Sequence, residues 1–386
     1  MFRNVYDRAL EMFSPVVLQI PASQICPYSE YDDLKRFPYL EEEADITQVM
    51  NMEHDVLSMV SRIPKPACDN IITLMACYKW KDSMHFLFPF IQANLSNVLR
   101  NSNNKCPGHL REKLTEGDIL VDHWLWKEIE GVSRALSAFH NEMKNPFKDV
   151  KGNVVALHFD LKPANILVTD DRKLKITDFG QSIIQIIDND RAKDLPHNTS
   201  GNPRYEPPEA RPSSQHLTKS SDDELMVSLN YDVWSLGCIM VEVLIHLLGK
   251  DLHAFDMALA GLKQTDEEPS VLKSGRFFEE PNGLKQCVKD SFETFENEFR
   301  NDSAQAEYMK DVVSLLRHML DDNKKTRAYS STVTQKLDQA RAKFEAIHDN
   351  GDSLVVAVSK HGNQDRKGFK ELGWRNGAEI VSFSEM

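Results

Sequence analysis

The sequence HFDLKPANILV at residues 158–168, followed by DFG at residues 178–180, is the part of the chain that decides its fold. Short apolar runs flank both motifs, and their length and composition predict small β-strands that carry polar side chains at their ends. The plain alternative is a β-turn and a hairpin that happen to be rich in acidic residues, but the length of the string argues against it. The predicted strands cover residues 154–157, 166–168 and 174–176.

Four polar side chains in this stretch have the chemistry that phosphoryl transfer needs. The carboxylate of Asp160 can accept a proton from an incoming hydroxyl or simply orient that hydroxyl, and the ammonium group of Lys162 can neutralise phosphate charge. Asn165 and Asp178 offer oxygen atoms, which are the ligands that Mg²⁺ prefers. The residues themselves therefore favour an enzyme that moves a phosphoryl group.

The pattern H-x-D-L-K-P-x-N followed by D-F-G resembles the catalytic and magnesium-binding loops of eukaryotic protein kinases. This resemblance implies an α+β, bilobal fold, with a small, mostly β N-terminal lobe that contains one helix and a larger, mainly helical C-terminal lobe. It also implies ATP and Mg²⁺ as cofactors. We expect the lobes at residues 1–88 and 89–345, and a tail at residues 346–386 to which we assign no role. The tail contains one strand-like run, residues 354–358.

The composition is that of an ordinary globular protein. Of the 386 residues, 41% are hydrophobic and 27% are charged, and the net charge is −13. Phosphate-rich surfaces attract the opposite sign of charge, so we expect neither nucleic acid nor a membrane as a partner. The most apolar helix-length run, residues 233–248, carries Glu242 and His246 and is too short to span a bilayer.

The cysteines and the N-terminal residues favour an intracellular location. The six cysteines are scattered, with no C-x-x-C pair and no Cys/His pairing at metal-binding spacing, which is typical of reduced thiols. Residues 1–13 are mixed and charged, and they lack the apolar core of a signal peptide. We therefore expect a protein of the cytoplasm, the nucleus or both.

The N-terminal part contains one predicted helix. Apolar residues at helical spacing predict it over residues 47–63, and Pro64 and Pro66 end it. In this helix, Glu53 resembles the kinase glutamate that pairs with a strand lysine gripping the nucleotide phosphates. Lys35 lies upstream of Glu53 at a separation typical of the family, so it is the candidate for that lysine. A solvated lysine is an equally good interpretation, because the neighbours of Lys35 make a poor buried strand.

Two strand-like runs, residues 71–78 and 85–90, follow this helix. The second run ends in Phe88-Pro89-Phe90, which reads as the start of a connector between two lobes. The resemblance places Phe88 and Phe90 beside the nucleotide.

Three helices are predicted in the C-terminal part. Apolar residues step by three and four over residues 125–139, with charged residues such as Glu128 and Glu130 between them, which predicts an amphipathic helix. A helix that is apolar on nearly every side begins at Tyr231, and this pattern predicts a buried central helix. A further helix is expected over residues 312–320.

Two motifs of the C-terminal part extend the resemblance. The sequence GNPRYEPPE at residues 201–209 resembles the substrate-docking segment of kinases, in which Glu209 would form a buried ion pair with Arg327. Two unrelated surface charges are the plain alternative. Asp232, in the string D-V-W-S-L-G-C, would accept hydrogen bonds from the backbone around His158, and an N-cap of the helix is the plain alternative.

The resemblance also implies an internal stack of side chains that links the two lobes. Its members would be His158, Phe179, Leu57 and Leu74. For the three apolar residues, ordinary core packing is an equivalent description.

Three departures from the family pattern bear on activity. Phe159 replaces the arginine that grips a phosphorylated activation loop in many kinases, so Thr199 or Ser200 need not act as a switch. Asn202 replaces a threonine that bridges the catalytic aspartate and lysine. No glycine precedes Gly108, so the glycine-rich loop that approaches the phosphates is missing. Either the nucleotide is held without that lid, or the chain lacks its true beginning.

We therefore expect a protein kinase that phosphorylates serine or threonine in protein substrates, because Lys162 differs from the pattern of tyrosine-specific kinases. The degenerate N-terminal lobe motivates one alternative, a catalytically impaired pseudokinase that acts as a binding module. A kinase-like small-molecule phosphotransferase is a further alternative, although such enzymes usually have histidine where Lys162 stands. The connector and the overall spacing resemble kinases that are numerous in filamentous fungi. The substrate and the oligomeric state are not predicted.

Overall fold

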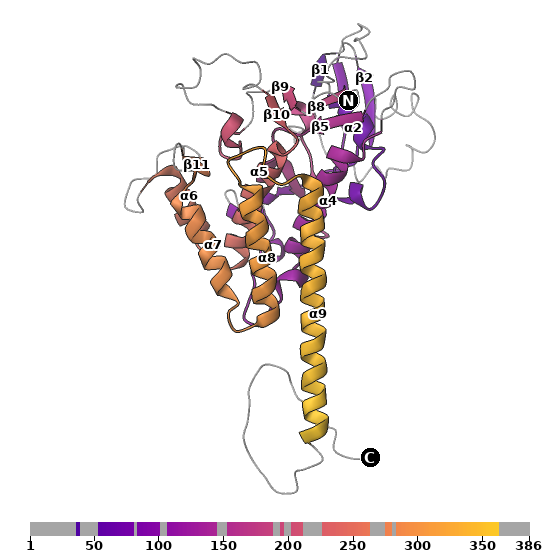
Figure 1. Ribbon diagram of the computed structural model, residues 1–386. Coiled ribbons are helices and arrows are strands. Elements are labelled where there is room, and N and C mark those ends of the chain that lie inside the picture. The colour runs from indigo at the N-terminus through magenta and orange to yellow at the C-terminus, as the bar shows by residue number, and fades with distance from the viewer. Residues whose placement is uncertain are drawn as a thin grey trace, which may run out of the picture.

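The computed structural model shows the expected α+β, bilobal architecture, with the small elements β1, β2 and α2 at one end and long helices in the rest (Figure 1). Residues 1–35 and 39–52, which include Lys35, lie outside the described part. The structure describes residues 36–38, 53–80, 83–100, 106–144, 153–187, 194–196, 202–210, 226–262, 275–279 and 283–362.

The N-terminal lobe contains a three-stranded antiparallel sheet in the order β1-β3-β2, formed by β1 (Arg36–Pro38), β2 (Ala76–Trp80) and β3 (Ser83–Leu87). The strands predicted at residues 71–78 and 85–90 are therefore shifted in the structure. Ile71 and Ile72 are buried but lie outside this sheet. Ile71 forms a parallel bridge with Ile176, and the amide of Ile72 donates to the Ile176 carbonyl at 2.9 Å.

Helix α2 (Glu53–Val60) is the one helix expected in this lobe. Val56, Leu57, Met59 and Val60 are buried, so the predicted apolar stripe faces the core. The helix ends at Val60, before the two prolines, although Ile63 is still buried. Residues 47–52 lie outside the described part of the chain.

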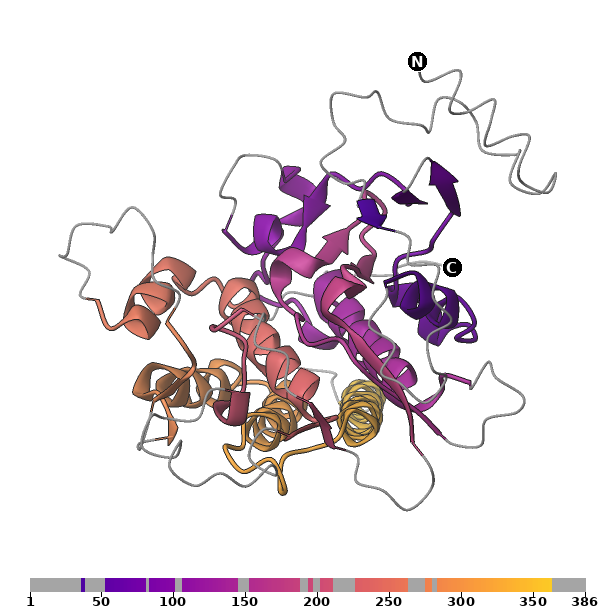
Figure 2. The ribbon, with the colours of Figure 1, turned by 90° about the horizontal axis from the view of Figure 1, so that it is seen from above.

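The C-terminal lobe is mainly helical. Its central helix has all 17 of its residues buried, which confirms the buried helix predicted from its all-round apolar sequence. Figure 2 looks along the chain's last helix, which packs beside the one before it. The helices are α3 (Leu95–Arg100), α4 (Trp124–Asn141), α5 (Tyr231–Leu247), α6 (Leu252–Ala260), α7 (Gln286–Glu298), α8 (Ser303–Met319) and α9 (Ser330–Gly362).

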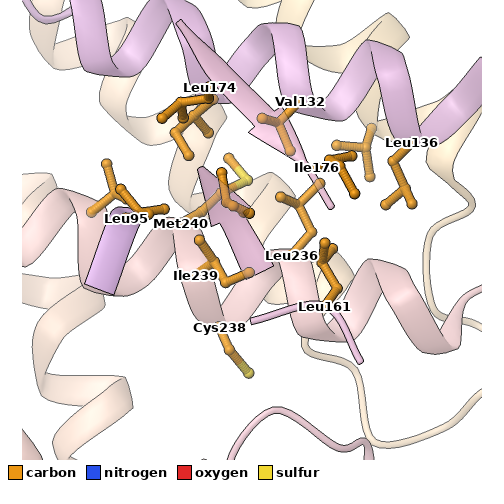
Figure 3. Close-up of a cluster of buried hydrophobic side chains, with 14 of the residues drawn as sticks. Leu95, Val132, Leu136, Leu161, Leu174, Ile176, Leu236, Cys238, Ile239 and Met240 are labelled. Carbon is orange, nitrogen blue, oxygen red and sulfur yellow. The ribbon is translucent and has the colours of Figure 1, made fainter. Parts of the chain in front are cut away.

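The core of this lobe lies between α4, α5 and the small strands that follow the HFDLKPAN motif (Figure 3). Leu236, Ile239 and Met240 of α5 gather there with Val132 and Leu136 of α4, and all five are almost fully buried. Isolated pairs of strands are only marginally stable in water. The short strands are therefore stabilised by packing on these two helices.

The three strands predicted around the opening motifs are confirmed. Strand β5 (Asn153–Leu157) pairs with β8 (Ile183–Ile187), and β6 (Ile166–Val168) pairs with β7 (Leu174–Ile176) and with β4 (Ala93–Asn94). The connection from β5 to β6 contains HFDLKPAN, and the connection from β7 to β8 contains DFG. Both loops therefore leave and re-enter the same two small antiparallel units, which brings the loops together.

Two further strand pairs and several 3₁₀ turns complete the described elements. Strand β10 (Met226–Ser228) pairs with β9 (Asp194–Pro196). Strands β11 (Phe278–Glu279) and β12 (Gly283–Leu284) form a second small pair.

The C-terminal helix corrects one prediction. Residues 354–358 were expected to be strand-like, but they lie inside α9, which runs past the ends of α7 and α8 (Figure 1). A strand needs a partner, whereas an established helix adds one hydrogen bond for each residue that it gains. The helix therefore continues through the apolar run.

Candidate active site

The loop between β5 and β6 is held by a buried carboxylate on α5. Asp232 accepts hydrogen bonds from the amides of His158 and Phe159, at 2.7 and 2.9 Å. The bond from His158 is the one expected from the sequence. The alternative, an N-cap, is wrong, because Asn230 is in the N-cap position. Phe159 has φ of 64°, a left-handed conformation that a bulky residue adopts only where its surroundings hold it.

Burial alone would raise the pKa of Asp232, but the hydrogen bond from His140 and the interactions with His140, His158 and the His158 amide outweigh burial and lower that pKa. The carboxylate therefore stays ionised at neutral pH and remains a strong acceptor for the two amides.

The side chains of Asp160, Lys162 and Asn165 converge within this loop. The ammonium group of Lys162 lies 2.6 Å from Oδ2 of Asp160, and Nδ2 of Asn165 donates to the same oxygen at 2.9 Å. Asn165 also donates to the backbone carbonyl of Asp160 at 2.9 Å. One oxygen of Asp160 is thus fixed by two donors, which orients the whole carboxylate.

The second oxygen of Asp160 is placed differently. Asp160 is only 7% exposed, and its Oδ1 is buried with no hydrogen-bond partner within the described residues. A buried carboxylate oxygen without a donor costs free energy, so such a group in a native structure indicates a ligand or a role in chemistry. A hydroxyl group that approaches this oxygen would supply the missing hydrogen bond.

Backbone and side-chain hydrogen bonds join the two loops. The amide of Thr177 donates to the carbonyl of Asn165 at 3.0 Å, and Nε2 of His158 lies 3.0 Å from the Thr177 carbonyl. Asp178 follows directly, with φ of 64°, and its side chain is half-buried. Asn165 and Asp178 are therefore next to each other in space through Thr177, although 13 positions separate them in the chain.

Phe179 lies at the base of these loops. Its ring is 5.1 Å from the ring of His158 and 5.5 Å from that of Phe139, measured between centroids. The 3₁₀ turn that contains Phe179 packs against α2, the helix of Leu57. Leu57 and Phe179 belong to the main core, and the half-buried Leu74 packs against it.

The donor set fits the cofactors that the resemblance implies. Mg²⁺ is commonly held by one or two carboxylates together with substrate phosphates, and Asp178 with the amide oxygen of Asn165 would provide the protein ligands. No group of three or more His, Cys, Asp or Glu side chains within the described residues could hold a metal by itself.

A buried ion pair lies at the end of the PPE segment. Nη1 and Nη2 of Arg327 donate to the two carboxylate oxygens of Glu209, at 2.7 and 2.8 Å. The side chain of Arg327 is fully buried. The pair expected from the sequence is therefore present, in place of two unrelated surface charges.

Comparison with known sequences agrees with this geometry. Residues 34–338 match the profile described as "Protein kinase domain". The chain belongs to the protein kinase family. It is 25% identical to Cyclin-dependent kinase-like 4 of Mus musculus over 345 residues, which are 88% of this chain and 82% of that protein.

Two other relatives match over shorter regions. The chain is 28% identical to Mitogen-activated protein kinase 15 of Caenorhabditis elegans over 182 residues, which are 46% of this chain and 31% of that protein. It is 37% identical to G2-specific protein kinase fin1 of Schizosaccharomyces pombe over 87 residues, or 22% of this chain and 10% of that protein. The matched regions thus span under a third of both relatives, and together the relatives support a serine/threonine protein kinase.

The nucleotide side of this kinase is described only in part. Lys35 lies outside the described residues, and Glu53 is the first residue of α2, with a side chain that is also outside them. Phe88 is half-buried against the core, and Phe90 is 49% exposed. The roles assigned to these four residues stay predictions.

Sequence reasoning missed a cluster of charges in and beside the GNPRYEPPE segment. Arg204 donates to Oε1 of Glu242 through Nε and Nη2, at 2.8 and 2.6 Å, and also binds Asp256. Arg100, at the end of α3, binds the same two carboxylates. The hydroxyl of Tyr205 completes the cluster at 3.1 Å from Glu242. A glutamate inside an otherwise apolar helix was the one signal that could have indicated it.

This cluster is electrically balanced, with two guanidinium groups for two carboxylates. Burial alone would raise the pKa values of Glu242 and Asp256, but Arg204 and Arg100 outweigh burial and lower both. Burial and the charge of Glu242 raise the pKa of Tyr205 against the effect of the two arginines, so its hydroxyl remains a donor. The segment that contains Arg204 is therefore tied to α3, α5 and α6 by ionised groups.

No helix in the part of the chain that the structure describes is both long and apolar enough to cross a membrane.

Proposed function

We propose that this protein kinase is catalytically active and transfers the γ-phosphate of ATP to serine or threonine hydroxyls of protein substrates. The observation that carries the proposal is the carboxylate of Asp160, which has one oxygen fixed by Lys162 and Asn165 and the other buried with no donor among the described residues. That oxygen is suited to accept a hydrogen bond from the substrate hydroxyl and then its proton.

Each polar residue of the site has a defined part in this proposal. Asp160 orients the hydroxyl, and Lys162, which lies beside it, offsets the negative charge of the transferred phosphoryl group. Asn165 and Asp178 would hold Mg²⁺. When bound with ATP, that ion neutralises charge on the phosphates and aligns them. The contact of His158 with the carbonyl of Thr177 keeps the two loops in register.

Phe159 supports a further part of the proposal, that activity does not require phosphorylation of the segment after DFG. Its ring packs at 4.9 Å from the ring of Tyr231, in an apolar cluster with Val155, Leu157 and Ile183. An arginine in this position could bind a phosphate, whereas a buried phenylalanine cannot.

A pseudokinase is the second candidate function, and one observation favours it. Residues 1–107 contain no glycine, so this part of the sequence offers no glycine-rich loop whose backbone amides could approach the phosphates closely. Asn202 in place of threonine points the same way. A small-molecule phosphotransferase is the weaker alternative, because Lys162 and the Glu209–Arg327 pair match the protein kinase pattern.

We also propose an intracellular location. The four cysteines among the described residues, at positions 68, 106, 238 and 287, have free thiols. Reduced thiols are usual in the cytoplasm and nucleus. The protein substrate remains defined only by its class.

The test begins with nucleotide binding and continues with transfer. Thermal unfolding of the full chain should shift upward with millimolar Mg-ATP, because a ligand that binds only the folded state stabilises it. Transfer of labelled phosphate to a generic basic protein should then occur on serine or threonine. Binding without transfer would favour the pseudokinase, and the absence of any thermal shift would contradict the active assignment.

The matched variants are Asp160→Asn and Asp170→Asn. The first removes the carboxylate that would take the proton, and we expect transfer to fall by at least a hundredfold while Mg-ATP still binds. Asp170 is an exposed aspartate in the turn between β6 and β7, so its variant should transfer phosphate like the unaltered chain. Equal transfer by the two variants would show that Asp160 has no part in the reaction.

A further inference from the structure

Beyond the residues that would meet ATP and the accepting hydroxyl, we propose that residues 275–278, GRFF, form a strap that positions the GNPRYEPPE segment for the protein substrate. Arg276 is the positioning residue of this strap, because its side chain donates a hydrogen bond to the backbone of the segment. This role rests on the proposed kinase function, in which the GNPRYEPPE segment docks the protein substrate. The kinetic arm of the test needs kinase activity, whereas its hydrogen-exchange arm does not.

Two consecutive prolines limit how the GNPRYEPPE segment can be held. Pro207 and Pro208 have no N–H group, so this stretch cannot be fixed by donors of its own backbone. Pro207 is buried, and a buried carbonyl needs a hydrogen-bond donor. The amide of Ala210 donates to the Pro207 carbonyl at 3.1 Å, and Nη2 of Arg276 donates to it at 3.3 Å. The first bond is local, whereas the second ties the segment to a distant part of the chain.

Phe277, the next residue of the strap, contacts the segment near its start. Phe277 is 1% exposed, and the central guanidinium carbon of Arg204 lies 5.8 Å from the centroid of its ring. The ring of Phe255 on α6 meets the same ring edge-on, with 5.7 Å between centroids. Cation–π contacts are stronger where water is excluded. Arg204 is therefore held by a buried aromatic ring as well as by the carboxylates of its charge cluster.

Phe278 acts on the far end of the segment through Trp234. The two rings meet edge-on, with 6.4 Å between centroids. Trp234 is also the ring on which the guanidinium group of Arg327 stacks, and Arg327 in turn binds Glu209. Three consecutive residues of the strap therefore act on the start, the middle and the end of the GNPRYEPPE segment.

The strap is anchored on the end of α6 and the start of α7. Gly275 runs so close to α6 that a Cβ atom there would collide with the carbonyl group of Leu259, and only glycine permits this approach. Lys285, the N-cap residue of α7, donates from its amide to the Phe277 carbonyl at 2.9 Å. Its ammonium group donates to the Leu259 carbonyl at 2.5 Å. The strap is thus fixed independently of the segment that it positions.

A segment held in this way has its substrate-binding form before the substrate arrives. A loosened segment would have to become ordered when the protein substrate binds, and this ordering lowers affinity. The residues proposed to hold Mg-ATP lie in other loops, which contain Asn165 and Asp178, so KM for ATP should stay unchanged. The expected signature of a damaged strap is therefore a higher KM for the protein substrate alone.

The experiment varies Arg276 in the full chain. Arg276→Lys keeps a donor for the Pro207 carbonyl, whereas Arg276→Met has a side chain of similar length without one. Arg300→Met, which removes an exposed arginine just after α7, is the control. With histone as the protein substrate, we expect Arg276→Met to raise KM for histone about fivefold, the usual net effect of one hydrogen bond, with kcat and KM for ATP unchanged. Arg276→Lys and Arg300→Met should keep the KM of the unaltered chain.

Hydrogen exchange gives a readout that does not depend on activity. The amides of Tyr205 and Ala210 both donate to carbonyls of the segment. They should exchange faster in Arg276→Met than in Arg276→Lys or Arg300→Met. If the unaltered chain transfers no phosphate, the proposed function fails, while these exchange rates still decide whether Arg276 holds the segment. Equal exchange rates in the three variants would overturn the proposal.

A second pair of variants moves the strap and leaves Arg276 in place. Gly275→Ala adds a methyl group that the carbonyl of Leu259 excludes, whereas Gly108→Ala adds one into open space. We expect faster exchange of the same two amides in Gly275→Ala only. A folded Gly275→Ala with the exchange rates of Gly108→Ala would show that the path of residues 275–278 does not position the segment. If Gly275→Ala fails to fold, the comparison of Arg276→Met with Arg276→Lys remains decisive.

Discussion

The guanidinium group of Arg327 and the carboxylate of Glu209 lie side by side in the protein interior, joined by two parallel hydrogen bonds of 2.7 and 2.8 Å. The same guanidinium group stacks on Trp234 of α5, with 5.1 Å between its central carbon and the ring centroid. This pair fastens the end of the GNPRYEPPE segment to the chain just before α9.

The first prediction concerns removal of one partner of this pair. Arg327→Met should lower the free energy of unfolding by about 3 kcal/mol, because it leaves the mostly buried carboxylate of Glu209 without its counterion. The double variant Arg327→Met, Glu209→Leu should recover part of that loss, since no unpaired charge remains. Urea unfolding measures both. Arg134→Met, in an exposed pair with Asp338, is the control and should cost under about 1 kcal/mol.

The second prediction concerns the cluster around Arg204. Glu242→Gln keeps the shape of the side chain but leaves Arg204 and Arg100 with one carboxylate between them, so we expect a loss of about 3–5 kcal/mol. The control is Glu296→Gln, whose partner Arg317 is exposed, with an expected loss of at most about 1 kcal/mol. Equal unfolding midpoints for the two variants would contradict the structural role of the cluster.

The third prediction concerns the phenylalanine in the catalytic loop. Phe159→Ala should cost about 3–5 kcal/mol, because it empties a buried site against Tyr231 and the apolar side chains around it. Phe90→Ala removes an exposed ring and should change the free energy of unfolding by less than about 0.5 kcal/mol. Chemical unfolding of both variants tests the cluster. Similar losses would mean that Phe159 is not an anchor.

Local signals explain what the sequence could predict of this fold. The small strands β5, β6 and β7 and the helices α4 and α5 follow from the spacing and apolarity of adjacent residues, which depend on nothing distant. The HFDLKPAN and DFG motifs could be found for the same reason. Within each motif, the residues that carry the chemistry lie within a few positions of one another.

Residues whose partners are remote in the chain could not be placed in this way. Glu128 and Glu130 were expected on the polar side of α4, but both are buried. Glu128 accepts hydrogen bonds from Asn70 at 2.8 Å and from Lys173 at 2.7 Å, and Glu130 binds Arg341 at 2.7 Å. A single sequence shows that such residues are charged, but not that a distant partner makes their burial tolerable.

The same limit applies to glycine and serine. Gly131 on α4 has no local reason to be glycine, yet a side chain there would collide with the amide of Asn70. Ser330 looks like an ordinary residue at the start of a helix, and its contact with His140 depends on how α9 packs on α4. These features come from tertiary packing, and periodicity carries no information about them.

The fourth prediction concerns the pH dependence of stability through His246, which is 3% exposed near the end of α5. Its Nε2 has no hydrogen-bond partner within the described residues, and burial, together with Lys113, Arg111 and His123, lowers its pKa to about 4. The unfolded chain takes up this proton near pH 6.5, whereas the folded chain does so only near pH 4.

His246 therefore does not reduce the free energy of unfolding above about pH 6.5, and it reduces that free energy progressively as the pH falls from there toward 4. Between pH 7.5 and 5.5 this one group should lower the free energy of unfolding by about 1 kcal/mol. His246→Leu should flatten that part of the profile, because the apolar side chain binds no proton in either state. The exposed His318→Leu serves as the control and should keep the slope of the unaltered chain. Urea unfolding at a series of pH values gives both slopes, and an unchanged slope in His246→Leu would show that this imidazole is not held neutral.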